Sequence, residues 1–195
     1  MNLTSAVRTV ALVSLFACPA LVQGQTSQVA QQDLEFAREA AVGGFKEVAL
    51  GELAQQQAKN EQVVQFGQQH MVEDHSLANE TLKTLAEEKG IQLPQELPAD
   101  AQQKYEELQQ LSDAEFDTAY MDEMVQDHEK TIELFEQQAE SGEDAALRGF
   151  AEETLPTLRE HLEMAKEVQS QLTAAREGDL EQKRVAKLGV ADHAG

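Results

Sequence analysis

The sequence predicts an all-α protein built as a four-helix bundle, with a long connection between the second and third helices. Apolar residues recur at three- and four-residue steps through four long segments, and no alternating strand pattern follows residue 24. Short turns separate the first pair and the last pair of segments. The middle pair is separated by residues 91–111, which contain Pro94 and Pro98. We therefore expect one helical domain over residues 33–175.

The first 24 residues have the features of a signal peptide. Arg8 is their only charge, and the apolar run Val10–Ala17 is too short to span a bilayer. Small residues at Val22-Gln23-Gly24 suit a signal peptidase, so we expect cleavage after Gly24. Two weaker alternatives are an uncleaved anchor and a lipoprotein that carries its lipid on Cys18.

Cleavage after Gly24 would remove Cys18, the only cysteine of the chain. The mature protein would then have no disulfide, no thiolate metal site and no thiol chemistry. The chain has 15 Lys and Arg against 36 Asp and Glu, a formal net charge of −21. Such a surface repels nucleic acid and attracts cations. We expect an exported protein of the periplasm or outer envelope, with no nucleic-acid partner and no membrane-spanning segment once the signal peptide is gone.

Capping and turn residues predict that the first two helices form a hairpin. After a flexible leader at residues 25–32, Asp33 is the expected N-cap of the first helix. That helix carries a stripe of mostly small residues, which suits close contact with a neighbour, and Glu47 lies within the stripe. The turn Lys59-Asn60 leads into a second helix, which we expect from Glu61 to Lys89 with Gly90 after its end.

The third helix has a recognisable start and end. Ser112-Asp113-Ala114-Glu115 matches a capping box, and Ser141-Gly142 is a typical stop. In the long connection before it, the apolar pattern predicts a short amphipathic helix at Ala101–Leu111.

The fourth helix is expected from Asp144 to Ala175, with a bend where Pro156 removes a backbone hydrogen bond. Residues 176–195 have few apolar side chains, and we expect them to form a frayed tail.

A repeated pentad carries the candidate chemistry. Met71–His75 and Met124–His128 both read Met-Val-x-Asp-His, and a further ligand type stands four residues before each Asp. Residues four apart share a helix face and can close on one ion. At 100° per residue, Asp74 falls near the centre of the apolar face of its helix, with His70 and His75 toward opposite edges. On the third helix, Asp127 and His128 flank the middle of the inner face. The candidate metal ligands are Glu47, His70, Asp74, His75, Glu123, Asp127, His128 and His161.

Nitrogen and oxygen donors without sulfur suit a divalent transition metal such as iron, manganese, zinc or copper. His161 fits less well, because residue counting places it roughly 9 Å beyond the level of His128. One alternative is an envelope structural or stress-related bundle whose Asp/His layer only fixes packing, with an envelope protein or a second copy as partner. Another is a di-metal redox enzyme, although the Glu-x-x-His motif of di-iron bundles is absent. No nucleophile arrangement or phosphate loop supports catalysis by protein groups alone.

Three motifs resemble those of a widespread bacterial exported family. They are Phe36-x-x-x-Ala40-Ala41-Val42-Gly43-Gly44 with the following Glu47, then Phe66-Gly67-x-x-x-Met71-Val72-x-Asp74-His75, then Phe150-Ala151-x-x-Thr154-Leu155-Pro156-x-Leu158-x-x-His161. The family is known as a domain of unknown function, and some members are labelled as outer-membrane proteins. The resemblance implies a ferritin-like helical bundle and export to the envelope. It implies no ligand and no reaction.

Overall fold

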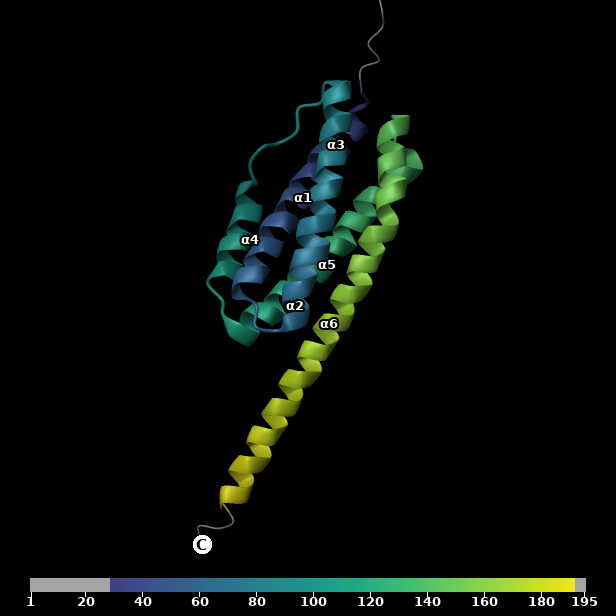
Figure 1. Cartoon of the computed structure of the whole chain (residues 1–195). Coiled ribbons are helices and arrows are strands. Elements are labelled where there is room, and N and C mark those ends of the chain that lie inside the picture. Colours follow the sequence, from purple (N-terminus) through teal and green to yellow (C-terminus); the bar gives the residue numbers. More distant parts are fainter. Residues whose placement is uncertain (1–28, 192–195) are drawn as a thin grey trace, which may run out of the picture.

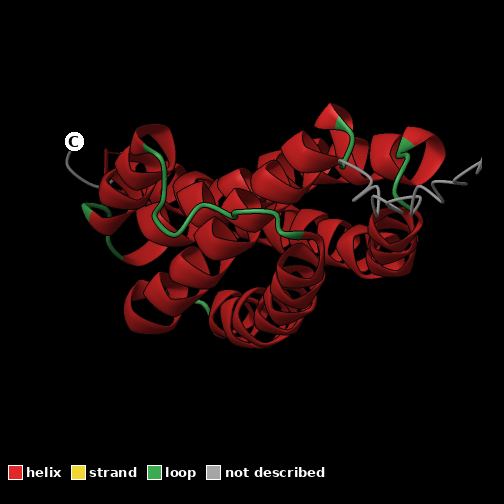
Figure 2. Ribbon diagram, turned by 90° about the horizontal axis from the view of Figure 1, so that it is seen from above, coloured by secondary structure: helices red, strands yellow, loops and turns green. Residues whose placement is uncertain are grey.

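The computed structural model describes residues 29–191, with side chains to residue 187, and every regular element in this range is a helix (Figures 1 and 2). The predicted all-α class is confirmed. The expected signal peptide lies outside the described residues. The elements are α1 (Gln31–Gln57), α2 (Glu61–Gln65), the π-helix η1 (Phe66–Asp74), α3 (His75–Lys89), α4 (Ala99–Gln109), α5 (Asp113–Ser141) and α6 (Ala145–Ala191).

The helices pack as two hairpins. Helix α1 runs along the continuous segment formed by α2, η1 and α3, and α5 runs along α6. Contacts of α1 with α5 and of α3 with α6 join the hairpins, and α4 covers α1 and α5 from outside (Figure 1). The predicted short helix in the long connection is α4, which begins two residues earlier than expected.

The core consists of two apolar clusters, one toward each end of the hairpins. In the first, the rings of Phe36, Phe135 and Phe150 pack with centroids 5.0–6.3 Å apart. The second contains Leu50 and Phe66 together with Tyr120 and Met124, among other buried residues. Along α1, α3, α5 and α6, the residues between the two clusters include one buried polar side chain each: Glu47, His75, His128 and His161.

Helices α1 and η1 approach closely at two glycines. A Cβ atom added to Gly51 would lie 2.6 Å from the carbonyl oxygen of Gly67, and one added to Gly67 would lie 3.0 Å from the carbonyl oxygen of Gly51. Real side-chain atoms do not fit at such separations. The predicted close contact along the first helix is therefore made by backbone against backbone at this point.

Several helix ends follow the predicted chemistry. The Asn60 side chain accepts a hydrogen bond from Gln62 N, and Gly90 has φ +67°, the left-handed conformation suited to glycine after a helix. Helix α5 ends at Ser141 as expected, and Asp144 caps α6 by accepting from Ala146 N and Leu147 N.

Asp33 does not cap the first helix as predicted, because α1 begins two residues earlier. Its carboxylate is fully buried and accepts hydrogen bonds from the Gln138 side chain and from the backbone N–H groups of Glu143 and Asp144. Asp33 therefore fixes the α5–α6 turn against the start of α1. Asp33 thus accepts backbone N–H groups, as an N-cap residue does, but those of a turn between two other helices.

The predicted capping box at the start of α5 does not form. The Ser112 side chain makes no capping hydrogen bond, and Asp113 has φ +54°. Asp tolerates this left-handed conformation better than most residues, but it changes the path of the chain that the box requires. The neighbouring Asp117 instead accepts hydrogen bonds from Lys59 N and Asn60 N, which ties the α1–α2 turn to α5.

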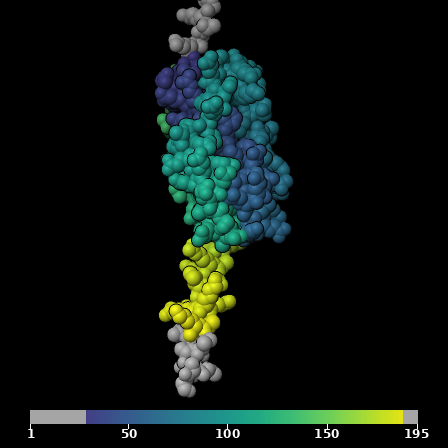
Figure 3. Space-filling view, turned by 90° about the vertical axis from the view of Figure 1, so that its left-hand side faces the viewer, coloured from purple at the N-terminus to yellow at the C-terminus, as the bar shows by residue number. Residues whose placement is uncertain are grey.

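Helix α6 extends beyond the expected end at residue 175 and continues to Ala191. Residues 173–187 are all exposed, and this part of the helix projects from the packed body (Figure 3). Apart from Gly178, most residues of this projecting part, such as Ala, Glu, Lys and Arg, favour the helix. Fraying of this tail in solution stays a prediction.

The glycine contact gives a matched pair of substitutions on one helix. Gly51→Ala should destabilise the protein by about 1–3 kcal/mol, because the added methyl group must separate α1 from η1. Gly43→Ala meets no atom within 4 Å and should stabilise α1 by about 0.5–1 kcal/mol through the helix preference of Ala. Urea unfolding of both variants measures the difference. Equal effects of the two substitutions would contradict the close contact.

Candidate metal centre

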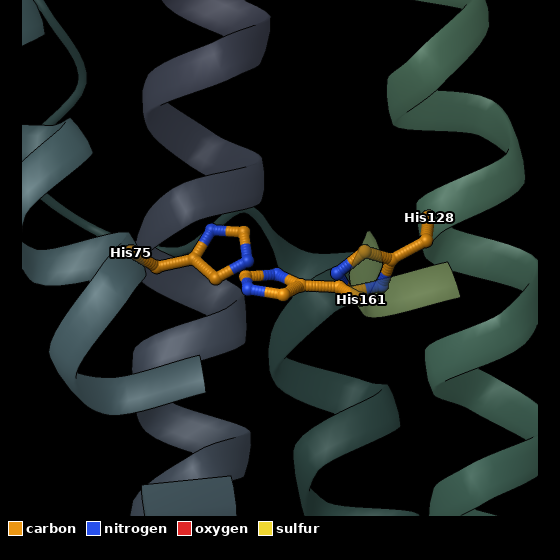
Figure 4. Close-up of side chains that lie close together, drawn as sticks. All are labelled: His75, His128 and His161. Atoms are coloured by element: carbon orange, nitrogen blue, oxygen red, sulfur yellow. The ribbon is translucent and has the colours of Figure 1, made fainter. Parts of the chain in front are cut away.

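Three histidines from three helices meet in the centre of the protein (Figure 4). His75 of α3, His128 of α5 and His161 of α6 have relative exposures of 7%, 1% and 2%. Their ring centroids are 5.5–5.6 Å apart in every pair. One ring nitrogen from each lies within 4.8 Å of the other two, an arrangement that could hold a metal ion. We call these three residues the histidine triad.

Each ring of the triad has a buried nitrogen with no hydrogen-bond partner among the described residues. The unpaired atoms are Nε2 of His75, Nε2 of His128 and Nδ1 of His161. The other nitrogen is engaged in two cases, since His128 Nδ1 lies 2.8 Å from the carbonyl oxygen of Met124 and His161 Nε2 lies 3.0 Å from Asp74 Oδ2. A carbonyl oxygen can only accept, so His128 Nδ1 donates its N–H and Nε2 keeps a free lone pair. A hydrogen bond from the second nitrogen is typical of metal-binding histidines.

The triad is kept neutral by its surroundings. Burial lowers the pKa of His75 well below its ordinary value, and the nearby His128 and His161 lower it further. Burial and His161 lower the pKa of His128 to about 4. The pKa of His161 is also lowered by burial, against the opposing effect of its hydrogen bond to Asp74. Neutral imidazole is the form that ligates a metal.

Because of the π-helix, His75 rather than Asp74 points into the core. In η1 the hydrogen bonds run from i to i+5, which turns later residues relative to a regular α-helix. His75 is therefore buried, whereas the Asp74 side chain is 44% exposed. The 100° rule fails for Asp74 and His75 because it assumes an uninterrupted α-helix. His128 lies on the regular helix α5 and is buried, in keeping with its predicted place beside the middle of the inner face.

His70 and Asp74 form a second group beside the triad. His70 Nδ1 lies 3.3 Å from Asp74 Oδ2, and the same oxygen contacts His161 Nε2. One donor atom from each of His70, Asp74 and His161 lies within 4.8 Å of the others. The predicted i, i+4 pairing of His70 and Asp74 is thus present, and its third member is His161.

His161 lies at the level of His128, contrary to the offset expected from residue counting. The α5–α6 turn takes up residues 142–144, so His128 is 13 residues before the end of α5 and His161 is 16 residues after the start of α6. The remaining offset of three residues is roughly 5 Å at 1.5 Å per residue. The two side chains cover that distance, since their ring centroids lie 5.5 Å apart.

Glu123 and Asp127 meet a lysine. Lys46 Nζ lies 2.6 Å from Glu123 Oε1 and 2.5 Å from Asp127 Oδ2, and Lys104 of α4 also pairs with Glu123. Burial would lower the pKa of Lys46, but its hydrogen bonds to the two carboxylates raise it above the ordinary value. The donor groups within 4.8 Å of one another do not include this pair. Sequence reasoning missed Lys46, although a single basic residue beside Glu47 in an acidic chain was an available signal.

Glu47 is buried with 3% exposure, and its Oε2 atom has no partner among the described residues. Burial raises its pKa well above the ordinary value, and the nearby Asp127 adds to this, which favours the protonated carboxyl group. Glu47 and His75 line the same small cavity of about 20 Å³. That volume is enough for about one water molecule. Glu47 thus faces inward as predicted, next to the triad.

Comparison with known proteins identifies the family. The fold and the site together define a class of protein: an all-helical protein with a buried histidine triad. The chain belongs to the family of the domain of unknown function DUF4142, whose family model matches residues 18–168. The resemblance inferred from the motifs is therefore confirmed. Among curated proteins, none matches the chain.

Two solved structures share the fold. One is a DUF305 protein of Streptomyces coelicolor that is proposed to be secreted, with a TM-score of 0.63 and 11% identity over 73% of this chain and 92% of that one. The other is a DUF305 fragment from Deinococcus radiodurans, with a TM-score of 0.65 and 9% identity over 73% of this chain and 98% of that one. Within residues 29–191, no helix has the length and apolar character needed to cross a membrane.

The lowered pKa values predict a loss of stability in acid. His128 has a pKa of about 4 in the folded protein and an ordinary value of 6.5, so between these values the unfolded state binds more protons. The stabilising contribution is complete above pH 6.5 and is lost as pH falls toward 4. For His128 it amounts to about 3 kcal/mol. Urea unfolding with chelator at pH 7 and pH 4.5 measures this loss.

A His128→Gln variant is the control, because it removes one of the titrating groups. Its stability should fall less than that of the wild type between the two pH values. Glu47 acts with the opposite sign, since its raised pKa gives a contribution that is present at low pH and lost as pH rises. Identical pH slopes for wild type and His128→Gln would contradict the neutral triad.

Proposed function

We propose that this protein binds a single transition-metal ion at His75, His128 and His161, as an exported member of its family. Two observations carry this proposal: each of the three rings, from three helices, has a buried nitrogen without a partner among the described residues, and one nitrogen of each ring lies within 4.8 Å of the other two. A buried polar atom without a hydrogen bond costs about 1–3 kcal/mol. Three such atoms in neighbouring buried rings are costly unless a ligand satisfies them.

The donor set narrows the choice of metal. Three imidazole nitrogens suit copper or zinc better than manganese, which prefers oxygen ligands. Three protein ligands also leave a coordination position open. Glu47 could balance part of the ion's charge across the shared cavity, because a nearby cation favours the ionised carboxylate. We therefore favour copper or zinc over manganese.

The two alternative functions fit the site less well. A polar layer that only fixes packing should have its hydrogen bonds satisfied, whereas this layer leaves three ring nitrogens and Glu47 Oε2 without partners. A di-metal redox enzyme needs carboxylates that bridge two ions. Here Glu123 and Asp127 are engaged by Lys46. The packing of α1, η1–α3, α5 and α6 supports a ferritin-like four-helix bundle as the scaffold.

The metal proposal is tested by binding measurements on wild type and triad variants. Wild-type protein should bind one equivalent of Zn²⁺ or Cu²⁺, and its melting temperature should rise with the ion in excess. At a free ion concentration of 100 times Kd the added stability is about 2.7 kcal/mol. His75→Gln and His128→Gln should each weaken binding at least tenfold, or about 1.4 kcal/mol.

Glu73→Gln is the matched control, because Glu73 is exposed and belongs to neither donor group. It should bind the ion as wild type does. Circular dichroism in the presence of chelator verifies that the Gln variants remain folded. Wild-type protein that binds neither ion, or His variants that bind with unchanged affinity, would overturn the proposal.

We further infer export to the periplasm or outer envelope, with cleavage after Gly24. The support is the amino-terminal sequence pattern, together with the proposed secretion of the structural neighbour from Streptomyces coelicolor. Intact-mass measurement of protein from the envelope fraction should give a chain that begins at Gln25. A mass that includes Met1, or a lipid on Cys18, would contradict this cleavage.

A further inference from the structure

Beside the buried triad lies a second donor group that reaches solvent. The side chains of His70 and Asp74 are 24% and 44% exposed, whereas that of His161 is 2% exposed. Their donor atoms lie within 4.8 Å of one another. The exposed fraction of donor side chains thus decreases from Asp74 and His70 to His161.

His161 belongs to both groups. Its Nε2 atom lies 3.0 Å from Asp74 Oδ2, and its Nδ1 atom is buried without a partner among the described residues. Its ring centroid is 5.0 Å from that of His70 and 5.5 Å from those of His75 and His128. The His161 ring therefore belongs to both the outer and the inner group, and its Nε2 atom is directed at Asp74 of the outer group.

The π-helix explains why both groups can form. His70 and His75 are five residues apart, and on a regular α-helix they would diverge by about 140°. The i to i+5 hydrogen bonds of η1 bring residues of this spacing toward the same side, where both rings contact His161. Phe66, at the start of η1, packs its ring 5.6–6.5 Å from those of His70, His128 and His161 and forms an apolar wall beside them.

We propose that His70 and Asp74 are an entry site, which captures a transition-metal ion from solvent and passes it by way of His161 to the buried triad. This inference rests on the proposed function. The outer site exchanges its ligands readily because water reaches it. The triad offers three nitrogens shielded from water and retains the ion. Transfer is a stepwise exchange of ligands, with no change in oxidation state.

The experiment follows Zn²⁺ uptake by stopped flow, with an indicator of free Zn²⁺ as the readout. Wild-type protein and His70→Ala should reach the same end point of one ion at the triad. The uptake rate of His70→Ala should be at least tenfold lower. Glu73→Gln is the control, since it removes a neighbouring exposed carboxylate outside both donor groups, and it should load at the wild-type rate.

A His128→Gln variant tests the entry site in a protein whose triad is incomplete. It should retain fast, weak uptake at His70 and Asp74 while it loses tight binding. Melting temperatures with chelator establish that His70→Ala remains folded. Uptake by His70→Ala at the wild-type rate would overturn the entry site and leave the triad intact. Loss of the tight site in His70→Ala would instead make His70 one of its ligands and also overturn the proposal. Absence of uptake by wild type would overturn both proposals.

Discussion

The π-helix at Phe66–Asp74 is the constraint on which the candidate metal centre depends. Its wider turn brings His75 into the core beside His128 and His161 and leaves Asp74 at the surface. It is held against α1 at the contact of Gly51 with Gly67, where neither residue has room for a Cβ atom. A π-turn within a longer helix is rare and is frequently found at functional sites. Backbone geometry at this one segment therefore connects the packing of the first hairpin to the chemistry of the centre.

The polar layer of Glu47, His75, His128 and His161 lies between the two apolar clusters of the core. Its composition is unusual for a layer that only fixes helix packing. Apolar clusters lie on either side, so the His75, His128 and His161 rings and the Glu47 carboxyl group are desolvated. Desolvation favours neutral imidazole and a protonated carboxyl group, which are the forms with least charge. At the ends of the hairpins, Asp33 and Asp117 accept hydrogen bonds from backbone N–H groups, and Glu123 and Asp127 pair with Lys46. Seven buried side-chain atoms have no hydrogen-bond partner among the described residues; four belong to the layer, and the others are Gln57 Oε1, Tyr120 Oη and Gln138 Oε1. The gathering of four such atoms in one layer supports a ligand there.

The family and the structural neighbours give evidence about the fold of this protein but not about the chemistry of its site. DUF4142 is a domain of unknown function, and identities of 9–11% with the DUF305 structures establish a shared arrangement of helices alone. Any function therefore has to be argued from the side chains of this chain. The triad provides such an argument because it specifies donor atoms, burial and protonation state together.

Much of the architecture follows from local sequence. The helical period, the turn residues Asn60 and Gly90, and the stop at Ser141-Gly142 predict the elements, because each depends on interactions within a few residues. His75, His128 and His161 were all among the predicted candidates. Only the tertiary structure decided that these three residues meet at one centre, because their meeting depends on the π-helix and on the length of the α5–α6 turn. The ion pairs of Lys46 with Glu123 and Asp127 were decided by the tertiary structure for the same reason. Packing brings partners from different helices together, and residue spacing along one helix does not encode it.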